Sequence, residues 1–367
     1  MNITCNKNDL SNSVNIVLKA VPGKSTMPIL ECLVIEVKDD QVKLIANNME
    51  LGIETYVKAE VAEEGSIAIN AKLFSEIIRK LPADEVMIQT DDNYQMKIVC
   101  GKSKFNLSGK MPEEFPMLPE VEKTQSVLIS QFTLRQIIQQ TIFSISDNEA
   151  NKIMTGELIE INDNQLRIVA LDGHRISIRK IMLKDTYQPV KVIIPGKTLN
   201  EISKILTGGM DDEVCMYFTD NHALFEFDGT KVVSRLIEGE YYKIDQMLSD
   251  DYDIKAKVNK KEFLDCIDRS TLLVRESEKK PIILNMENNM MELKIQSAMG
   301  SMKEDIEIEQ EGPEIMIGFN PKFLMDALKV IEDEEVELYF YNPKAPCFIR
   351  DKEKSYIYLI LPVNFNV

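Results

Sequence analysis

A short helical pattern occurs three times in this chain, and its copies are equally spaced in the sequence. Its basic residue is Lys72 in the first copy, Lys197 in the second and Lys322 in the third. Further positions repeat at the same spacing: Phe74, Leu199 and Leu324; Glu76, Glu201 and Asp326; Leu81, Leu206 and Ile331. When one pattern repeats along a chain, each copy forms one structural unit, so the repeat defines the organisation of the whole fold. The sequence therefore predicts three copies of one unit.

Each unit is expected to contain two helices and several strands. The repeated pattern has the apolar spacing of an amphipathic helix and follows strand-like runs at 67–70, 192–195 and 316–320. A second amphipathic pattern lies at 8–20, 131–142 and 260–272. Short alternating stretches typical of strands include 42–45, 166–169 and 356–359. We predict an α+β fold of three tandem domains, each with two helices packed on antiparallel sheet, at 1–122, 123–248 and 249–367.

The composition is that of an acidic globular protein. Hydrophobic residues make up 44% of the chain, charged residues 28%, and the net charge is −17. No stretch approaches the roughly 20 apolar residues of a membrane span, and the N-terminus does not resemble a signal peptide. The six cysteines are scattered. We therefore expect reduced, mostly buried thiols, a cytoplasmic location, no metal site and no cofactor.

The repeated helices are more basic than the chain as a whole. A single helix with lysines is usually only solvated by them. Here Lys72, Lys197 and Lys322 recur at one helical position, so a pseudo-symmetric assembly would gather them on one surface. Such a lining binds phosphates without reading bases, and the acidic remainder would steer DNA toward it.

The sequence contains one cluster with possible chemistry, Asp172-Gly173-His174-Arg175. His174 beside a carboxylate could act as a general base, but no nucleophile motif accompanies it. A turn between two strands, or a binding surface, explains the cluster as well. The fragments Gly23-Lys24-Ser25 and Gly196-Lys197-Thr198 lack the earlier glycine that a phosphate-binding loop requires.

Several motifs, in this order and at these spacings, resemble the bacterial sliding clamp family, the beta subunit of DNA polymerase III. They are MPIL at 27–30, FNLS at 105–108, EFP at 114–116, LDGHRI at 171–176, VIIP at 192–195, IGFN at 317–320 and LPV at 361–363. The likeness covers the full length. It implies a non-catalytic ring, a head-to-tail homodimer that encircles duplex DNA and gives the replicative polymerase its processivity.

The resemblance also implies where partners bind. The dimer contact would join Phe105 and Leu107 of one subunit to Leu272 and Leu273 of the other. A pocket between the second and third domains would receive short linear motifs from the polymerase III alpha subunit, the clamp loader, other polymerases and repair proteins. Its residues here would be Met154, Leu171, Gly173, His174, Arg175, Ile176, Tyr242, Met247, Pro346, Leu359, Leu361, Pro362 and Val363.

The residues expected to face DNA come partly from the repeat and partly from the resemblance. They are Lys24, Lys72, Asn148, Lys152, Lys197, Lys204 and Lys322. The loop that contains Asn148 and Lys152 is often aromatic in the family, so base stacking is not expected here. The chain also departs from the family pattern at 239–244, on the rim of the pocket, where the usual proline and aspartate–tyrosine pair are absent.

Two other functions are compatible with these residues. A ring-shaped scaffold could keep the fold and the pocket while serving partners other than DNA. A hydrolase could use His174. Retention on circular but not linear DNA would identify a clamp, whereas turnover lost in a His174→Ala variant would identify an enzyme.

Overall fold

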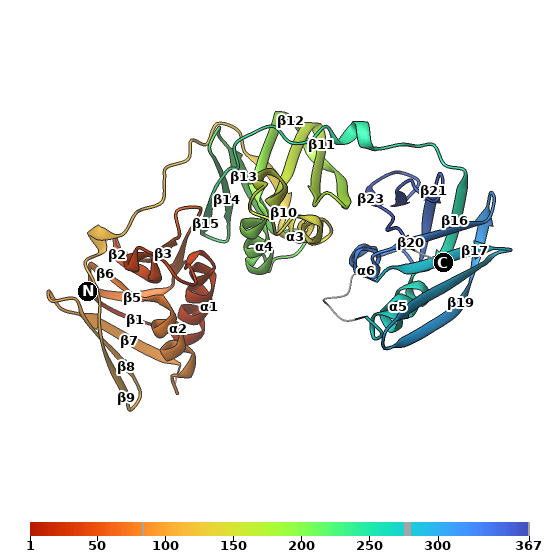
Figure 1. Ribbon diagram of the computed structural model, residues 1–367. Coiled ribbons are helices and arrows are strands. Elements are labelled where there is room, and N and C mark those ends of the chain that lie inside the picture. Colours follow the sequence, from red (N-terminus) through yellow and green to blue (C-terminus); the bar gives the residue numbers. More distant parts are fainter. Residues whose placement is uncertain (83, 275–279, 366–367) are drawn as a thin grey trace. The chain divides into compact units, whose positions relative to one another are not determined.

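The computed structural model describes residues 1–82, 84–274 and 280–365 (Figure 1). The chain forms two compact units. The first contains Met1–Thr133 and Lys204–Leu236, and the second contains Leu134–Ser203 and Ile237–Val367. Each unit has its own sheet structure and is described by itself.

The helices lie where the repeated apolar spacing predicts them. The α-helices of the described residues are α1 (Lys7–Val17), α2 (Ala71–Lys80), α3 (Gln131–Gln139), α4 (Gly196–Ile205), α5 (Lys260–Thr271) and α6 (Pro321–Val330). Short 3-10 helices are η1 (Leu18–Ala20), η2 (Pro28–Glu31), η3 (Pro112–Glu114), η4 (Ile142–Ser144), η5 (Lys152–Thr155) and η6 (Ile244–Met247). In the middle repeat, the helix expected at 131–142 ends earlier, at Gln139, because the chain turns there and continues as η4.

The starts of the repeated helices are fixed by side-chain caps. The Asn70 carboxamide accepts a hydrogen bond from the Leu73 amide at 3.0 Å, and Asn320 accepts one from the Lys322 amide at 3.0 Å. Asparagine is a favoured residue at this position because it satisfies an amide that has no partner within the helix. Pro195 stands at the equivalent place before α4.

The first unit contains two antiparallel sheets. The five-stranded sheet has the order β5 (Ala59–Glu63), β1 (Asn2–Asn6), β7 (Glu85–Thr90), β8 (Gln95–Cys100), β9 (Ser103–Ser108). The eight-stranded sheet has the order β10 (Val127–Ser130), β13 (Glu213–Phe218), β14 (His222–Phe227), β15 (Thr230–Arg235), β4 (Leu51–Val57), β3 (Gln41–Asn47), β2 (Cys32–Lys38), β6 (Gly65–Asn70). Helices α1 and α2 lie side by side in this unit (Figure 1) and bury Leu10, Val14, Phe74 and Ile78.

The second unit is built on one sheet of ten strands. Its order is β11 (Gly156–Leu171), β12 (Arg175–Pro195), β23 (Tyr356–Ile360), β22 (Cys347–Arg350), β21 (Glu335–Phe340), β16 (Ile254–Asn259), β19 (Gly300–Glu311), β18 (Met290–Ser297), β17 (Ile282–Glu287), β20 (Ile315–Phe319). Helices α5 and α6 pack together, and Phe263 and Leu324 contribute to the same fully buried core as Phe319.

The middle repeat is shared between the two units. Strand β15 pairs with β4 of the first repeat, with Val232 opposite Ile53. Strand β12 pairs with β23 of the third repeat, with Ile176 opposite Leu359. The two compact units therefore correspond to the strands that share a sheet. The domain boundaries at 122 and 248 remain predictions.

The cysteines confirm the expected thiols. All six are unpaired, and every one except the partly exposed Cys215 is buried. Burial raises the pKa of the Cys5 and Cys266 thiols to about 12, so these groups are uncharged and unreactive at neutral pH. Within the described ranges, no helix is long and apolar enough to span a membrane.

Candidate functional site

The pairing of β12 with β23 joins two segments that are far apart in the sequence. Arg175 lies opposite Ile360 and Ile176 opposite Leu359. Beyond the paired strands, the Leu361 amide donates a hydrogen bond to the His174 carbonyl oxygen at 2.9 Å. The turn at 172–174 and the segment at 359–361 are therefore held directly beside each other.

An apolar cluster covers one face of these strands. Leu171, Ile176 and Leu359 are buried members of it, and Met154 and Tyr242 pack against it from the edge. Side chains on paired strands share a face when their residues are opposite each other. Five of the residues predicted to form the partner pocket thus belong to one cluster, which we call the apolar cluster.

The other predicted pocket residues are exposed or half-buried, apart from the buried Arg175. Met247 is 47% exposed and Leu361 is 38% exposed. Gly173 and His174 are also exposed, and the half-buried members are Pro346, Pro362 and Val363. Adjacent exposed apolar side chains often mark a binding surface.

The segment 241–250 runs over the same sheet and is anchored along its length. The Tyr241 hydroxyl donates to the Val169 carbonyl oxygen at 3.2 Å. Asp245 pairs with Arg167 at 2.9 Å, and Asp250 pairs with Arg350 at 2.8 Å. Met247 lies between these two acidic residues in the sequence, so the chain is anchored on both sides of it.

The rim that departs from the family pattern has its own contacts. The Asn151 carboxamide donates to the Tyr242 hydroxyl at 2.7 Å. Tyr241 and Tyr242 meet edge to face with ring centroids 6.1 Å apart. Two tyrosines and an asparagine therefore stabilise this rim.

Asp172 organises the turn that carries His174. One carboxylate oxygen accepts from the amides of His174 at 2.9 Å and Arg175 at 3.1 Å. Gly173 has φ +88°, a conformation that glycine adopts without strain. The second oxygen accepts from Arg175 Nε at 3.0 Å. The carboxylate thus serves the turn and Arg175, and these contacts favour a structural role over a general-base pair with His174.

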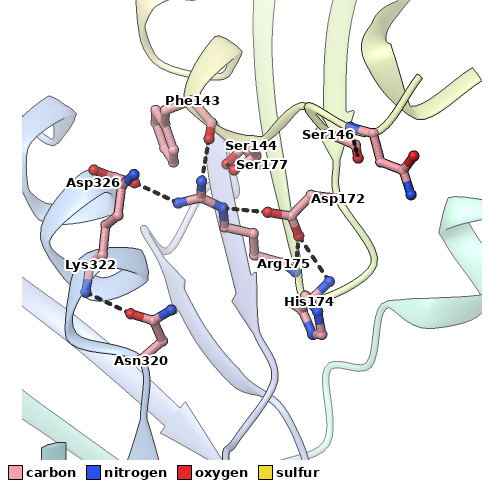
Figure 2. Close-up of polar contacts among 11 residues, drawn as sticks. Phe143, Ser144, Ser146, Asp172, His174, Arg175, Ser177, Asn320, Lys322 and Asp326 are labelled. Atoms are coloured by element: carbon pink, nitrogen blue, oxygen red, sulfur yellow. Dashed lines mark hydrogen bonds and ion pairs between the residues drawn. The ribbon is translucent and has the colours of Figure 1, made fainter. Parts of the chain in front are cut away.

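Arg175 is the most highly connected side chain near the turn (Figure 2). It is 7% exposed. Besides Asp172, its guanidinium donates to Asp326 Oδ2 at 2.7 Å and to the Phe143 carbonyl oxygen. It also lies over the Phe323 ring, 4.3 Å from the ring centroid. The sequence did not predict these partners. Asp326 was visible only as the third member of the repeated acidic position.

A hollow of about 830 Å³ lies on the side of Arg175 that faces α6. It is lined by three of the residues predicted to face DNA: Asn148, Lys197 and Lys322. His174 and Arg175 line it too, together with Phe323 and Asp326 of α6. The structure therefore brings part of the predicted DNA-facing set close to the turn of the predicted partner pocket.

The remaining DNA-facing candidates are exposed. In the first unit, the Lys72 ammonium donates to the Gly23 carbonyl oxygen at 3.0 Å, next to Lys24. Lys152 and Lys204 are exposed on η5 and α4. Lys197 pairs with Glu149 at 2.8 Å, and both side chains are largely in solvent, where such a pair contributes little to stability.

The predicted dimer residues lie on the edge strand β9 and just after helix α5. Phe105 is 37% exposed on β9, the outermost strand of its sheet, and Leu107 is half-buried on the same strand. Leu272 is 74% exposed just after α5. Leu273 is half-buried and lies close to Gly300, where β19 begins.

Comparison with known proteins identifies the family. Models of the N-terminal, central and C-terminal domains of the DNA polymerase III beta subunit match residues 1–119, 128–243 and 245–364. The chain belongs to the DNA polymerase III beta subunit family. The three matched segments agree in number and order with the three repeats.

Relatives and solved structures match over the full length. A beta sliding clamp of Staphylococcus epidermidis is 36% identical over 374 residues, covering 99% of both chains. A crystal structure of a DNA polymerase III beta subunit from Eubacterium rectale is 59% identical, with a TM-score of 0.96 and full coverage of both chains. A DNA polymerase sliding clamp from Bacillus subtilis is 35% identical, with a TM-score of 0.94 and the same coverage.

The family membership decides between the three functions considered from the sequence. The chain is a sliding clamp of DNA replication, a non-catalytic processivity factor with three tandem α+β domains. A hydrolase that uses His174 and a scaffold for partners other than DNA are not favoured.

Proposed function

We propose that the apolar cluster and its exposed rim receive short apolar segments of polymerases, the clamp loader and repair proteins. One observation carries this proposal: the pairing of β12 with β23 sets the exposed His174 turn beside the exposed Leu361. A peptide that binds there would touch two repeats of one sheet. Methionine and leucine at the rim suit several partners, because flexible apolar side chains repack.

The expected affinity is modest. Full burial of a leucine or an aromatic side chain contributes roughly 1.5–3 kcal/mol. Ordering a free peptide and fixing its position offsets much of this gain. A short peptide with a glutamine, a leucine and an apolar–aromatic pair is therefore expected to bind with a dissociation constant on the order of micromolar.

Fluorescence anisotropy with such a labelled peptide tests the proposal. Leu361→Ala and His174→Ala are expected to weaken binding, since each removes a side chain beside the cluster. Met182→Ala is the matched control, because Met182 is an apolar side chain on the same strand β12, 64% exposed but outside the cluster. No binding by the parent protein, or undiminished binding by both variants, would refute the pocket.

We further propose that two chains close a ring head to tail. Among the described residues, β9 pairs only with β8, and residues 300–307 of β19 pair only with β18. Each therefore offers a free edge that another strand can join. Lys102 and Lys104 flank the first edge. The second carries Glu304, Asp305 and Glu307 against Lys303, and Glu304 already pairs with Arg269, so the second edge is acidic on balance and complements the first.

The DNA contact follows from the basic side chains. We propose that Lys24, Lys72, Asn148, Lys152, Lys197, Lys204 and Lys322 face a duplex and contact its phosphates without reading its sequence. The hollow that Asn148, Lys197 and Lys322 share supports this assignment in the second unit. A role in replication, together with reduced thiols, supports a cytoplasmic location.

A further inference from the structure

We propose that Asp326, on helix α6, is a positioning residue for the partner pocket, although it belongs to neither the apolar cluster nor its rim. It acts through Arg175, which fixes the turn that carries His174. This inference rests on the proposed pocket, and it assigns to Asp326 and Arg175 a role different from direct contact with a peptide.

A continuous chain of hydrogen bonds leads from α6 to the pocket (Figure 2). Asp326 accepts from Arg175 Nη1 at 2.7 Å, and Asp172 accepts from Arg175 Nε at 3.0 Å. Asp172 in turn holds the amide of His174. The His174 carbonyl oxygen then accepts from the amide of Leu361 at 2.9 Å. The first two bonds join side chains, and the last two hold the backbone amide and carbonyl group of His174.

A second contact joins α6 to the same turn. The His174 ring stacks on Phe323 of α6, with centroids 6.2 Å apart and planes inclined by 24°. The Arg175 guanidinium covers Phe323 as well. Helix α6 therefore holds the turn in two ways. Asp326 acts through Arg175 on the backbone of the turn, and Phe323 contacts the His174 side chain.

Arg175 itself is poorly placed to contact a peptide. It is almost fully buried, and each of its three guanidinium nitrogens already donates to a protein oxygen. A planar, charged fork in which each nitrogen already makes a hydrogen bond fixes the geometry of its partners. Asp326 supplies the acceptor for Nη1, whereas Asp172 serves Nε and the Phe143 carbonyl oxygen serves Nη2.

The expected effect is a loss of peptide affinity without a loss of fold. Asp326→Ala frees one side of Arg175, and we expect peptide affinity to fall about tenfold, within the usual range for coupling between adjacent sites. Asp326→Asn keeps an oxygen that accepts from Arg175. Its affinity for the peptide should therefore lie between that of the parent and that of Asp326→Ala. Lys329→Ala, an exposed change on the same helix, is the control and should bind as the parent does.

Amide hydrogen exchange separates positioning from general destabilisation. In Asp326→Ala the amides of His174 and Arg175 should exchange faster, while the amides of β17 and β18 keep the parent rate. Peptide binding by the parent but equal affinity in Asp326→Ala would overturn the positioning role and leave the pocket standing. Faster exchange throughout the unit would also overturn it, since the effect would then be one of stability. No binding by the parent would overturn both proposals.

Discussion

Ile176 and Leu359 lie directly opposite each other on the paired strands β12 and β23. Both side chains are buried in the apolar cluster. Because this pairing joins the middle repeat to the last one within one sheet, a ligand over the cluster would be held by both repeats. The proposed partner pocket thus depends on the pairing of the middle repeat with the third repeat.

The basic side chains predict a salt-dependent interaction with DNA. Reversing Lys72, Lys197 and Lys322 to Glu should weaken duplex binding, because fewer counterions are released. Each lysine that contacts a phosphate contributes about 0.9 to the slope of log affinity against log salt. We expect the slope of the triple variant to be flatter by about 2 to 3, as measured by anisotropy with a labelled duplex.

A matched triple variant makes this result specific. Lys38, Lys58 and Lys184 are exposed lysines outside the proposed DNA-facing set. Reversing them changes the net charge by the same amount. If both triple variants lose the same slope, the effect is one of net charge, and the proposed DNA-facing surface is wrong.

The dimer contact is expected to fail when a charge is introduced at Leu273. Leu273→Asp would place an unpaired carboxylate in the proposed interface, which is strongly penalised. Light scattering at micromolar concentration should show a dimer for the parent and a monomer for the variant. Phe105→Asp, at the other side of the contact, should have the same effect, whereas Met182→Asp should not. A monomeric parent would contradict the head-to-tail ring.

Glu157 gives the second unit a dependence of stability on pH. Its carboxyl group is fully buried on β11, and neither oxygen has a hydrogen-bond partner among the described residues. Burial raises the pKa of Glu157 to about 8. The titratable side chain that faces it is Tyr241, whose own pKa is raised by burial and then by Glu157.

The sign of this effect follows from proton binding. The folded state keeps the proton on Glu157 up to about pH 8, while the unfolded chain loses it near the ordinary value of 4.5. The unfolding free energy therefore falls between these values as pH rises, by about 1.4 kcal/mol per unit. Glu157→Gln should abolish this fall and stabilise the protein at pH 7 by about 3 kcal/mol. Urea unfolding at pH 5, 7 and 9 measures both effects. A variant with the parent's pH profile would contradict the assignment.

The repeated helices could be predicted because their information is local. The apolar spacing defines a helix face, and Asn70 and Asn320 mark where two of the helices begin. The equal spacing of Lys72, Lys197 and Lys322 then gave three units without any comparison. Alternation indicated the strands, but their order in the sheets depends on pairings that leave no local signal.

Long-range contacts account for what the sequence did not reveal. Asp326 meets Arg175 only because α6 packs against β23, the neighbour of β12 in the sheet, and nothing near either residue predicts that contact. Glu157 and Glu160 lie in the same apolar run of β11, and nothing in the sequence distinguishes the completely buried Glu157 from the partly exposed Glu160. The division of the middle repeat between two units likewise depends on the β15–β4 and β12–β23 pairings.

Retention on DNA of different topology tests the central claim most directly. The protein would be assembled on nicked circular DNA with a clamp loader and ATP, then separated from free protein by gel filtration before and after one restriction cut. A closed ring should travel with the circle and be lost when the DNA becomes linear, because it slides off the ends. Equal retention on both forms would indicate ordinary surface binding and would contradict a ring that encircles the duplex.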